Sequence, residues 1–153
     1  MNARGAGLDS PARLDIHTSA EDLRFASEWL ERECVHRDVP AEQIMRLDLC
    51  LNEAIANVMA HGGKAAALTP VHLTLMTEAE ASTRHAELCI VDAGQPFNPL
   101  VADIPQAADT LAEASIGGLG LLMIGNCADE LGYEYRDGRN HLRVTVRWGG
   151  ALP

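Results

Sequence analysis

The sequence predicts an α+β fold, a two-layer sandwich in which helices cover one face of a mixed, mainly antiparallel sheet. Two stretches in the first half repeat apolar residues at helical spacing. Later stretches alternate apolar and polar residues, which is typical of half-buried strands. The last two of these flank Asp137-Gly138, a strong signal for a hairpin turn. The expected order is therefore strand, helix, helix, two strands, a long loop, helix and hairpin.

Length and composition limit the class of protein. The 153 residues are enough for one domain with a full core, and a hydrophobic content of 47% supports a globular fold. We expect a flexible tail over residues 1–12 and one folded domain over residues 13–149. The net charge of -10 argues against direct nucleic-acid binding and permits basic protein partners. No apolar run could span a bilayer and the first residues lack a signal core, so we expect a cytoplasmic protein without membrane contact.

The cysteines do not form a recognisable framework. They lie far apart in predicted helices and strands, and no two of them form a CxxC pair. Buried, reduced thiols are expected here rather than disulfides or a zinc site. The four residues are Cys34, Cys50, Cys89 and Cys127.

The first strand and helix follow the tail. Alternation over residues 13–17 predicts a short strand. Ser19 and Asp22 resemble a capping box, which opens a helix that extends to about Val35. Trp29 belongs to the buried side of this helix, and core packing is its expected role.

A second helix, over residues 41–60, carries one polar stripe. Pro40 suits its start, and the run His61-Gly62-Gly63 is expected to end it. Glu53, Asn57 and His61 are four residues apart and therefore share one side of the helix. Small and apolar neighbours frame this stripe, which suits a pocket wall; the alternative is an exposed helix edge. The opposite, apolar face consists of Leu47, Leu51, Ile55 and Val58.

Two strands then lead to a second polar position. Residues 71–76 and 86–91 are the expected strands, and the polar residues 77–85 contain the turn between them. Asp92-Ala93-Gly94 stands at the end of the second strand. An aspartate in this place is suited to hold a ligand, or it bonds its own backbone in a turn.

A long loop and a glycine cluster come next. Residues 98–116 are interrupted by prolines, although residues 106–114 could form a short helix, and a segment of this length is typical of a lid. Gly117, Gly118 and Gly120 lead into an expected helix over 121–131. Glycines at a helix start can cradle phosphate with backbone amides, or they act as a hinge. The final hairpin strands are expected at residues 133–136 and 142–148.

Several familiar sites are absent from the sequence. It contains no GxxxxGK[ST] and therefore no P-loop. Gly118-Leu119-Gly120 lacks the third Rossmann glycine, since Met123 stands there. The sequence has no HExxH and its six histidines are scattered, which argues against zinc.

Taken together, three separated elements resemble the nucleotide site of the GHKL ATPase superfamily, which includes gyrase and the histidine kinases. The N box corresponds to Glu53-Ala-Ile-Ala-Asn57, and the DxG box to Asp92-Ala-Gly94. The glycine box corresponds to Gly117-Gly118-Leu119-Gly120. These boxes are in the family's order and cover about residues 40 to 148. The resemblance implies the two-layer Bergerat fold of this superfamily.

Finer features resemble the small anti-sigma factor serine kinases. After Asn57 the chain continues to His61-Gly62, and after the DxG box it continues Gln-Pro-Phe97-Asn98-Pro99. The resemblance implies a kinase that uses ATP with magnesium to phosphorylate a serine of an anti-sigma factor antagonist. It also implies alternate binding to a sigma factor, and a homodimer. Histidine kinases are a poorer match, because they precede this domain with a dimerising phosphoacceptor hairpin. The 52 residues before this N box are too few for that hairpin together with the first strand and helix.

The resemblance and the chemistry of the side chains together assign roles. Asn57 offers a hard oxygen to magnesium, and Glu53, one turn earlier, can act as the general base. Asp92 can accept a hydrogen bond from the adenine amino group, while Gly94 lets the base approach. The remaining residues of the expected cofactor site are Phe97, Gly117, Gly118, Leu119 and Gly120.

Two positions depart from this pattern or stay open. Arg139-Asn140-His141 stands where the family often has a Gly-Thr pair, so the usual threonine contact to adenine is not expected. Lys64 is a possible phosphate contact, or simply a surface lysine. Two other functions remain open beside the kinase. One is an ATP-binding interaction module without phosphate transfer, and the other is an ATP-hydrolysing switch.

Overall fold

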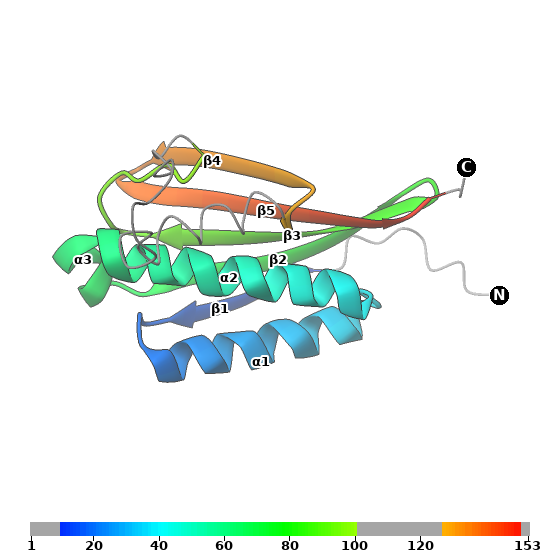
Figure 1. Ribbon diagram of the computed structural model, residues 1–153, viewed down its shortest axis with the longest axis horizontal. Coiled ribbons are helices and arrows are strands. Elements are labelled where there is room, and N and C mark those ends of the chain that lie inside the picture. Colours follow the sequence, from blue (N-terminus) through cyan, green and yellow to red (C-terminus); the bar gives the residue numbers. More distant parts are fainter. Residues whose placement is uncertain (1–9, 101–126, 151–153) are drawn as a thin grey trace, which may run out of the picture.

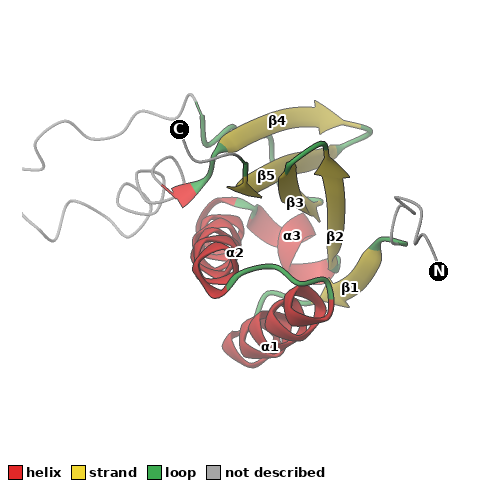
Figure 2. Cartoon of the chain, turned by 90° about the vertical axis from the view of Figure 1, so that its right-hand side faces the viewer, coloured by secondary structure: helices red, strands yellow, loops and turns green. Residues whose placement is uncertain are grey.

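A five-stranded sheet and three helices form two layers in the structure, a computed structural model that describes residues 10–100 and 127–150. Figure 1 shows the helices running across the sheet, and Figure 2 shows them together on one face of it. The strand order is β1-β2-β3-β5-β4, and every pair of neighbours in this sheet is antiparallel. The helices are α1 (Ala20–His36), α2 (Ala41–His61) and α3 (Gly63–Leu68). The strands are β1 (Ala12–Ile16), β2 (Val71–Glu80), β3 (Thr83–Asp92), β4 (Glu130–Arg136) and β5 (Arg139–Gly149). The predicted fold class is confirmed.

The core lies between α1, α2 and the face of the sheet that they cover. Alternate residues of β2, β3 and β5 point into it, because successive side chains of a strand face opposite sides. The predicted apolar face of α2 and Trp29 of α1 meet them there. Each fully buried aliphatic side chain contributes about 1.5–3 kcal/mol relative to exposure. The largest fully buried side chains are Leu30, Leu47, Leu51, Ile55, Leu73, Leu75, Leu88, Ile90, Val71, Val144 and Val146.

The start of α1 agrees with the prediction, and the expected burial of the cysteines holds for Cys34 and Cys50, while Cys89 and Cys127 are only half-buried. Ser19 is the N-cap, and its hydroxyl accepts a hydrogen bond from the Asp22 amide at 3.1 Å. All four cysteines are free, with Cys34 and Cys50 buried in the core. Within the described residues, no helix has both the length and the apolar character needed to cross a membrane.

The two strands on either side of the turn are longer than predicted. β2 continues to Glu80 and β3 begins at Thr83, so only two residues form the turn, and Ala81 adopts a φ of 54° there. Residues 78–80 are all exposed, and Arg84 donates a hydrogen bond to the Arg37 carbonyl, just after α1, at 3.2 Å. The polarity of this stretch therefore marks the exposed end of a long hairpin rather than a loop.

The end of α2 agrees with the prediction, because the helix ends at His61 and Gly62 is its C-cap. Gly62 keeps a right-handed helical conformation, with φ -72° and ψ -21°, and a further short helix, α3, follows it. The positive φ of 71° occurs one residue later, at Gly63. Near the other end, residues 130 and 131 lie in β4 rather than in the predicted helix over 121–131. Gly132 also lies in β4, opposite Arg143, whose guanidinium would lie 2.6 Å from an added Cβ.

Other predictions fall outside the described residues. These are most of the N-terminal tail, the lid from residue 101 onward, its possible short helix over 106–114, and the first part of the helix over 121–131. The glycine box also lies there, with Gly117, Gly118, Leu119 and Gly120.

Candidate functional site

The polar stripe of α2 borders a pocket in the part of the chain that the structure describes. Asn57 lines this pocket and is only 6% exposed, yet no described residue forms a hydrogen bond with its carboxamide. Because Asn57 lines the pocket, its carboxamide can form a hydrogen bond with a ligand that enters there. Glu53 lies one turn earlier on the same helix, is half-buried, and is not part of the pocket lining. The polar stripe of α2 therefore forms part of the pocket wall at Asn57, whereas Glu53 lies outside the pocket lining.

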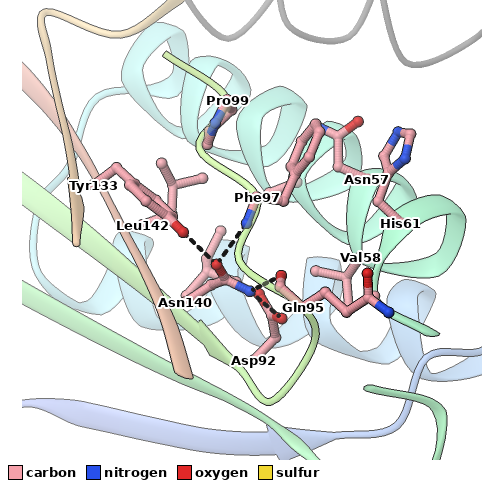
Figure 3. A pocket seen from close by; sticks show the side chains of 13 residues that line it. Asn57, Val58, His61, Asp92, Gln95, Phe97, Pro99, Tyr133, Asn140 and Leu142 are labelled. Carbon is pink, nitrogen blue, oxygen red and sulfur yellow. Dashed lines mark hydrogen bonds between the residues drawn. The ribbon is translucent and has the colours of Figure 1, made fainter. Parts of the chain in front are cut away.

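The pocket opens between α2, the end of β3 and the hairpin of β4 and β5 (Figure 3). Its apolar walls come from Ala54, Val58, Ile90 and Leu142. Its cavity volume is only about 30 Å³, room for one or two water molecules. A larger ligand must therefore move side chains aside or extend into the space beyond the pocket mouth.

An aromatic pair stands beside Asn57 in this pocket. The rings of His61 and Phe97 are stacked, with centroids 4.5 Å apart and an angle of 13° between their planes. Both residues line the pocket, and Figure 3 shows them close to Asn57. Phe97, predicted from the sequence as a cofactor-binding residue, thus has a position in the site that permits this role.

Asp92 lies in the same pocket, at the end of β3. It is 7% exposed, and its Oδ1 accepts hydrogen bonds from the Gly94 amide at 2.8 Å and from Asn140 Nδ2 at 3.0 Å. Both interpretations of the sequence therefore apply, because the aspartate bonds its own backbone turn and also faces the pocket. Every hydrogen bond that the described residues make to this carboxylate ends on Oδ1, so Oδ2 is left for a donor from the pocket.

Gly94 holds the loop after β3 against the end of α2. A Cβ at this position would lie 2.7 Å from the Gly62 Cα and 2.8 Å from Asp92 Oδ1. The amide of Gln95 also donates to the Gly62 carbonyl at 3.3 Å. The need for glycine here thus has a packing reason that sequence reasoning did not give: the N-box helix and the DxG loop touch backbone to backbone.

Sequence reasoning also missed the role of Asn140. Its Nδ2 donates to Asp92 Oδ1 and, at 2.8 Å, to the Gln95 carbonyl. Its Oδ1 accepts from the Phe97 amide at 3.0 Å and from the Tyr133 hydroxyl. Figure 3 shows this amide at the centre of the network. The available signal was its place in the segment that departs from the family pattern.

Strand pairing and burial support this network. Asn140 of β5 lies directly opposite Asp92 of β3 in the sheet register. Burial is the main cause that raises the pKa of Tyr133 above its ordinary value, so its hydroxyl stays protonated and remains a donor at neutral pH. Asn140 is itself 5% exposed, and the network is therefore shielded from bulk water.

The described residues offer a simple donor set for a cation. They contain no cluster of three or more His, Cys, Asp or Glu side chains that could hold a metal by themselves. Asn57 is a pocket residue that could supply one neutral oxygen, which suits Mg²⁺ when phosphates and water provide the other ligands. Lys64 is exposed on α3 and does not line the pocket.

Comparison with known proteins places this geometry in a family. The model of the histidine kinase-like ATPase domain matches residues 16–146, which span both α2 and the hairpin of β4 and β5. The chain belongs to this family. The predicted resemblance to the GHKL ATPases is therefore confirmed.

Among curated relatives, the histidine kinase-like chain is similar to the serine/threonine-protein kinase BtrW of Bordetella bronchiseptica. The two are 32% identical over 132 residues, which cover 86% of this chain and 90% of BtrW. The family and the class of kinase expected from the sequence agree with this relative.

Two solved structures share the fold. One contains the RsbU and RsbW domains of Rv1364c from Mycobacterium tuberculosis, with a TM-score of 0.61 and 13% identity; the match covers 90% of this chain and 32% of that one. The other is the SiaB–SiaC complex from Pseudomonas aeruginosa, with a TM-score of 0.63 and 13% identity, covering 88% of each chain. Both neighbours therefore share the two-layer fold of this chain.

Proposed function

We propose that this chain is an ATP-dependent serine/threonine kinase that phosphorylates an anti-sigma factor antagonist and also acts as an anti-sigma factor. The single observation that carries the proposal is the pairing, in one pocket, of a buried carboxamide without a described partner and a carboxylate with one free oxygen. The first suits a magnesium ion on phosphates, and the second suits the amino group of adenine. Similarity to a serine/threonine-protein kinase over most of both chains supports the same function.

The residues present fit Mg-ATP. Asn57 would supply one oxygen to magnesium, and Asp92 Oδ2 would accept from the adenine amino group. A bound magnesium ion would neutralise charge on the transferring phosphate. We keep Gly117, Gly118, Leu119 and Gly120 as the proposed phosphate-binding amides on the strength of the sequence alone.

Glu53 is the proposed general base. It lies on α2 one turn from Asn57, and it is half-buried rather than paired with a described cation. A carboxylate in this place can take the proton from an incoming serine hydroxyl as phosphate transfer proceeds. If Glu53 activated water instead of a serine hydroxyl, the same site would hydrolyse ATP. If it activated neither, the domain would bind ATP without transferring phosphate and would act as an interaction module.

The partners follow from the proposed circuit. We propose an anti-sigma factor antagonist as substrate, a sigma factor or equivalent regulated protein as alternate partner, and a homodimer in the cytoplasm. The net charge of -10 favours basic protein surfaces over nucleic acid. None of these partners needs to enter the adenine end of the pocket, where Asp92 and Asn140 lie.

Two variants of α2 separate binding from catalysis. Glu53→Gln keeps the shape of the side chain and should bind Mg-ATP normally while transfer falls by about 10²–10⁴-fold. Asn57→Ala removes the proposed metal ligand and should weaken ATP binding in magnesium but change it less in EDTA. The measurements are calorimetric ATP affinity, phosphate release, and transfer to a candidate antagonist domain.

The outcomes that would contradict these roles are distinct. Phosphate transfer at the wild-type rate by Glu53→Gln would reject Glu53 as the base. Normal binding and transfer by both variants would reject the site, and phosphate release without transfer would favour the switch.

A further inference from the structure

The side-chain amide of Asn140 fixes the carboxylate at the adenine end of the pocket. It spans three elements, because it joins Asp92 at the end of β3, the backbone of the following loop, and the hydroxyl of Tyr133 on β4. Both ends of the side-chain amide form hydrogen bonds within the protein. Nδ2 donates to Asp92 Oδ1 and the Gln95 carbonyl, and Oδ1 accepts from the Phe97 amide and the Tyr133 hydroxyl. Because its hydrogen-bonding groups are occupied by protein atoms, Asn140 is not expected to bind a ligand directly.

The arrangement determines which oxygen of Asp92 meets a ligand. Oδ1 is held by two donors, at 2.8 Å from the Gly94 amide and at 3.0 Å from Asn140 Nδ2. Oδ2 remains for the pocket, and an ionised oxygen there accepts but cannot donate. Such a site favours a base with an amino group and disfavours one with a carbonyl oxygen at the same place.

We propose that Asn140 is a positioning residue for base recognition, which orients the carboxylate of Asp92 toward an amino-bearing purine. The inference rests on the proposed function and deepens it by naming what selects the base. In this proposal Asn140 does not contact the ligand; its buried amide contacts Asp92, and Asp92 contacts the ligand. Asn140 therefore acts through Asp92 and through the loop that carries Phe97.

Asn140→Asp is the most direct test, because it replaces only the side-chain NH₂ group by oxygen and keeps the size and shape of the side chain. The new carboxyl would face Asp92 Oδ1 across a distance that is 3.0 Å in the wild type. Two carboxylates this close do not ionise independently, so one of the two pKa values rises. When the pair holds a proton, the new group can donate to Asp92 as the amide did, and when both ionise it repels Asp92.

The measurement is calorimetric affinity for ADP with magnesium over a pH series from about pH 4 to about pH 9, which covers the range in which a carboxyl pKa raised by a second carboxylate falls. It is reported as the ratio of variant affinity to wild-type affinity, so that the ionisation of the nucleotide cancels. We expect this ratio to be level below the raised pKa and to fall above it, by up to about tenfold per pH unit. Tyr133→Phe is the matched control. It removes one bond to the same amide but no donor to Asp92, so its ratio should not change with pH.

A second variant covers the case in which Asn140→Asp does not fold. Asn140→Ala adds no charge and removes one of the two donors that hold Asp92 Oδ1, so the carboxylate is less constrained and the preference for ADP over inosine diphosphate should shrink. A pH-independent ratio in Asn140→Asp, or unchanged preference in a folded Asn140→Ala, would overturn the inference and leave the proposed function standing. Failure of the wild-type chain to bind ADP would overturn both.

Discussion

At the scale of single residues, Gly94 decides whether the DxG loop can reach the N-box helix. Its φ is not in the left-handed region, so the constraint is space and not backbone conformation. The atoms in the way are the backbone of Gly62 and the carboxylate of Asp92, and neither can swing aside as the end of a flexible side chain could. Contact between the end of α2 and the loop after β3 therefore depends on the absence of a Cβ at Gly94.

Gly94→Ala should therefore reduce both stability and ADP affinity. Overpacking of this kind costs about 1–3 kcal/mol in the free energy of unfolding, measured by urea denaturation. The matched control is Gly138→Ala, since a Cβ at Gly138 would meet nothing within 4 Å although its φ is +72°. The control should lose about 1–2 kcal/mol from backbone strain and keep its ADP affinity. Equal ADP affinity in both variants would contradict the packing role of Gly94.

The core cysteines provide a second residue-scale prediction. Burial raises the pKa of Cys34 and of Cys50 to about 12. At about pH 8 only on the order of one in ten thousand of these thiols is ionised, and the thiolate is the reactive form. Iodoacetamide should therefore leave both residues unmodified in the native chain and label them after denaturation. The half-buried Cys127 is the internal reference, and mass spectrometry of native protein that finds Cys34 or Cys50 labelled first would contradict this burial.

At the scale of elements, one arginine joins α2 to the chain that enters β4. Arg46 Nε donates to the Cys127 carbonyl at 2.6 Å, and its two terminal nitrogens lie 3.1 and 3.2 Å from the carboxylate of Asp129. The Arg147 amide of β5 donates to the same carboxylate at 2.6 Å. Asp129 thus connects the helix layer with the edge of the sheet.

The pH dependence of this link has a definite sign. Burial opposes ionisation of Asp129, but the hydrogen bonds from Arg46 and the Arg147 amide outweigh it and hold the pKa below its ordinary value. A lowered carboxyl pKa contributes stability above the unfolded pKa, and that stability is lost as the pH falls through the folded pKa. Asp129→Asn should lower the free energy of unfolding by about 1 kcal/mol at neutral pH. The difference from wild type should shrink below about pH 4, as measured by urea titration at each pH. A difference that stayed constant down to about pH 2 would reject this account.

At the scale of the whole molecule, the sequence predicts what depends on local periodicity. The polar stripe of α2 follows from a period of 3.6, and the structure places its Asn57 on the pocket wall. Asp92 follows from its place at the end of a buried strand. Both depend on residues close together in the chain, which is why they could be located without the fold.

What could not be predicted depends on pairing across the sheet. Asn140 meets Asp92 because β5 lies beside β3 in one particular register, and a shift by one residue would have turned the amide to the other face. The extent of β2 and β3 was missed because the polar, exposed end of a long hairpin resembles a loop in the sequence. The end of α2, by contrast, was predicted correctly, since His61 and Gly62 are close together in the chain and signal it locally.

The strand order has a consequence for how the chain folds. Two antiparallel pairs, β2 with β3 and β4 with β5, join neighbours in the sequence and need only short turns. The pairing of β3 with β5 instead joins the two hairpins through residues that lie far apart in the sequence, such as Asp92 and Asn140, and β3 is the central strand of the sheet. Because contacts between distant residues form slowly, docking of one hairpin on the other should set the speed of folding.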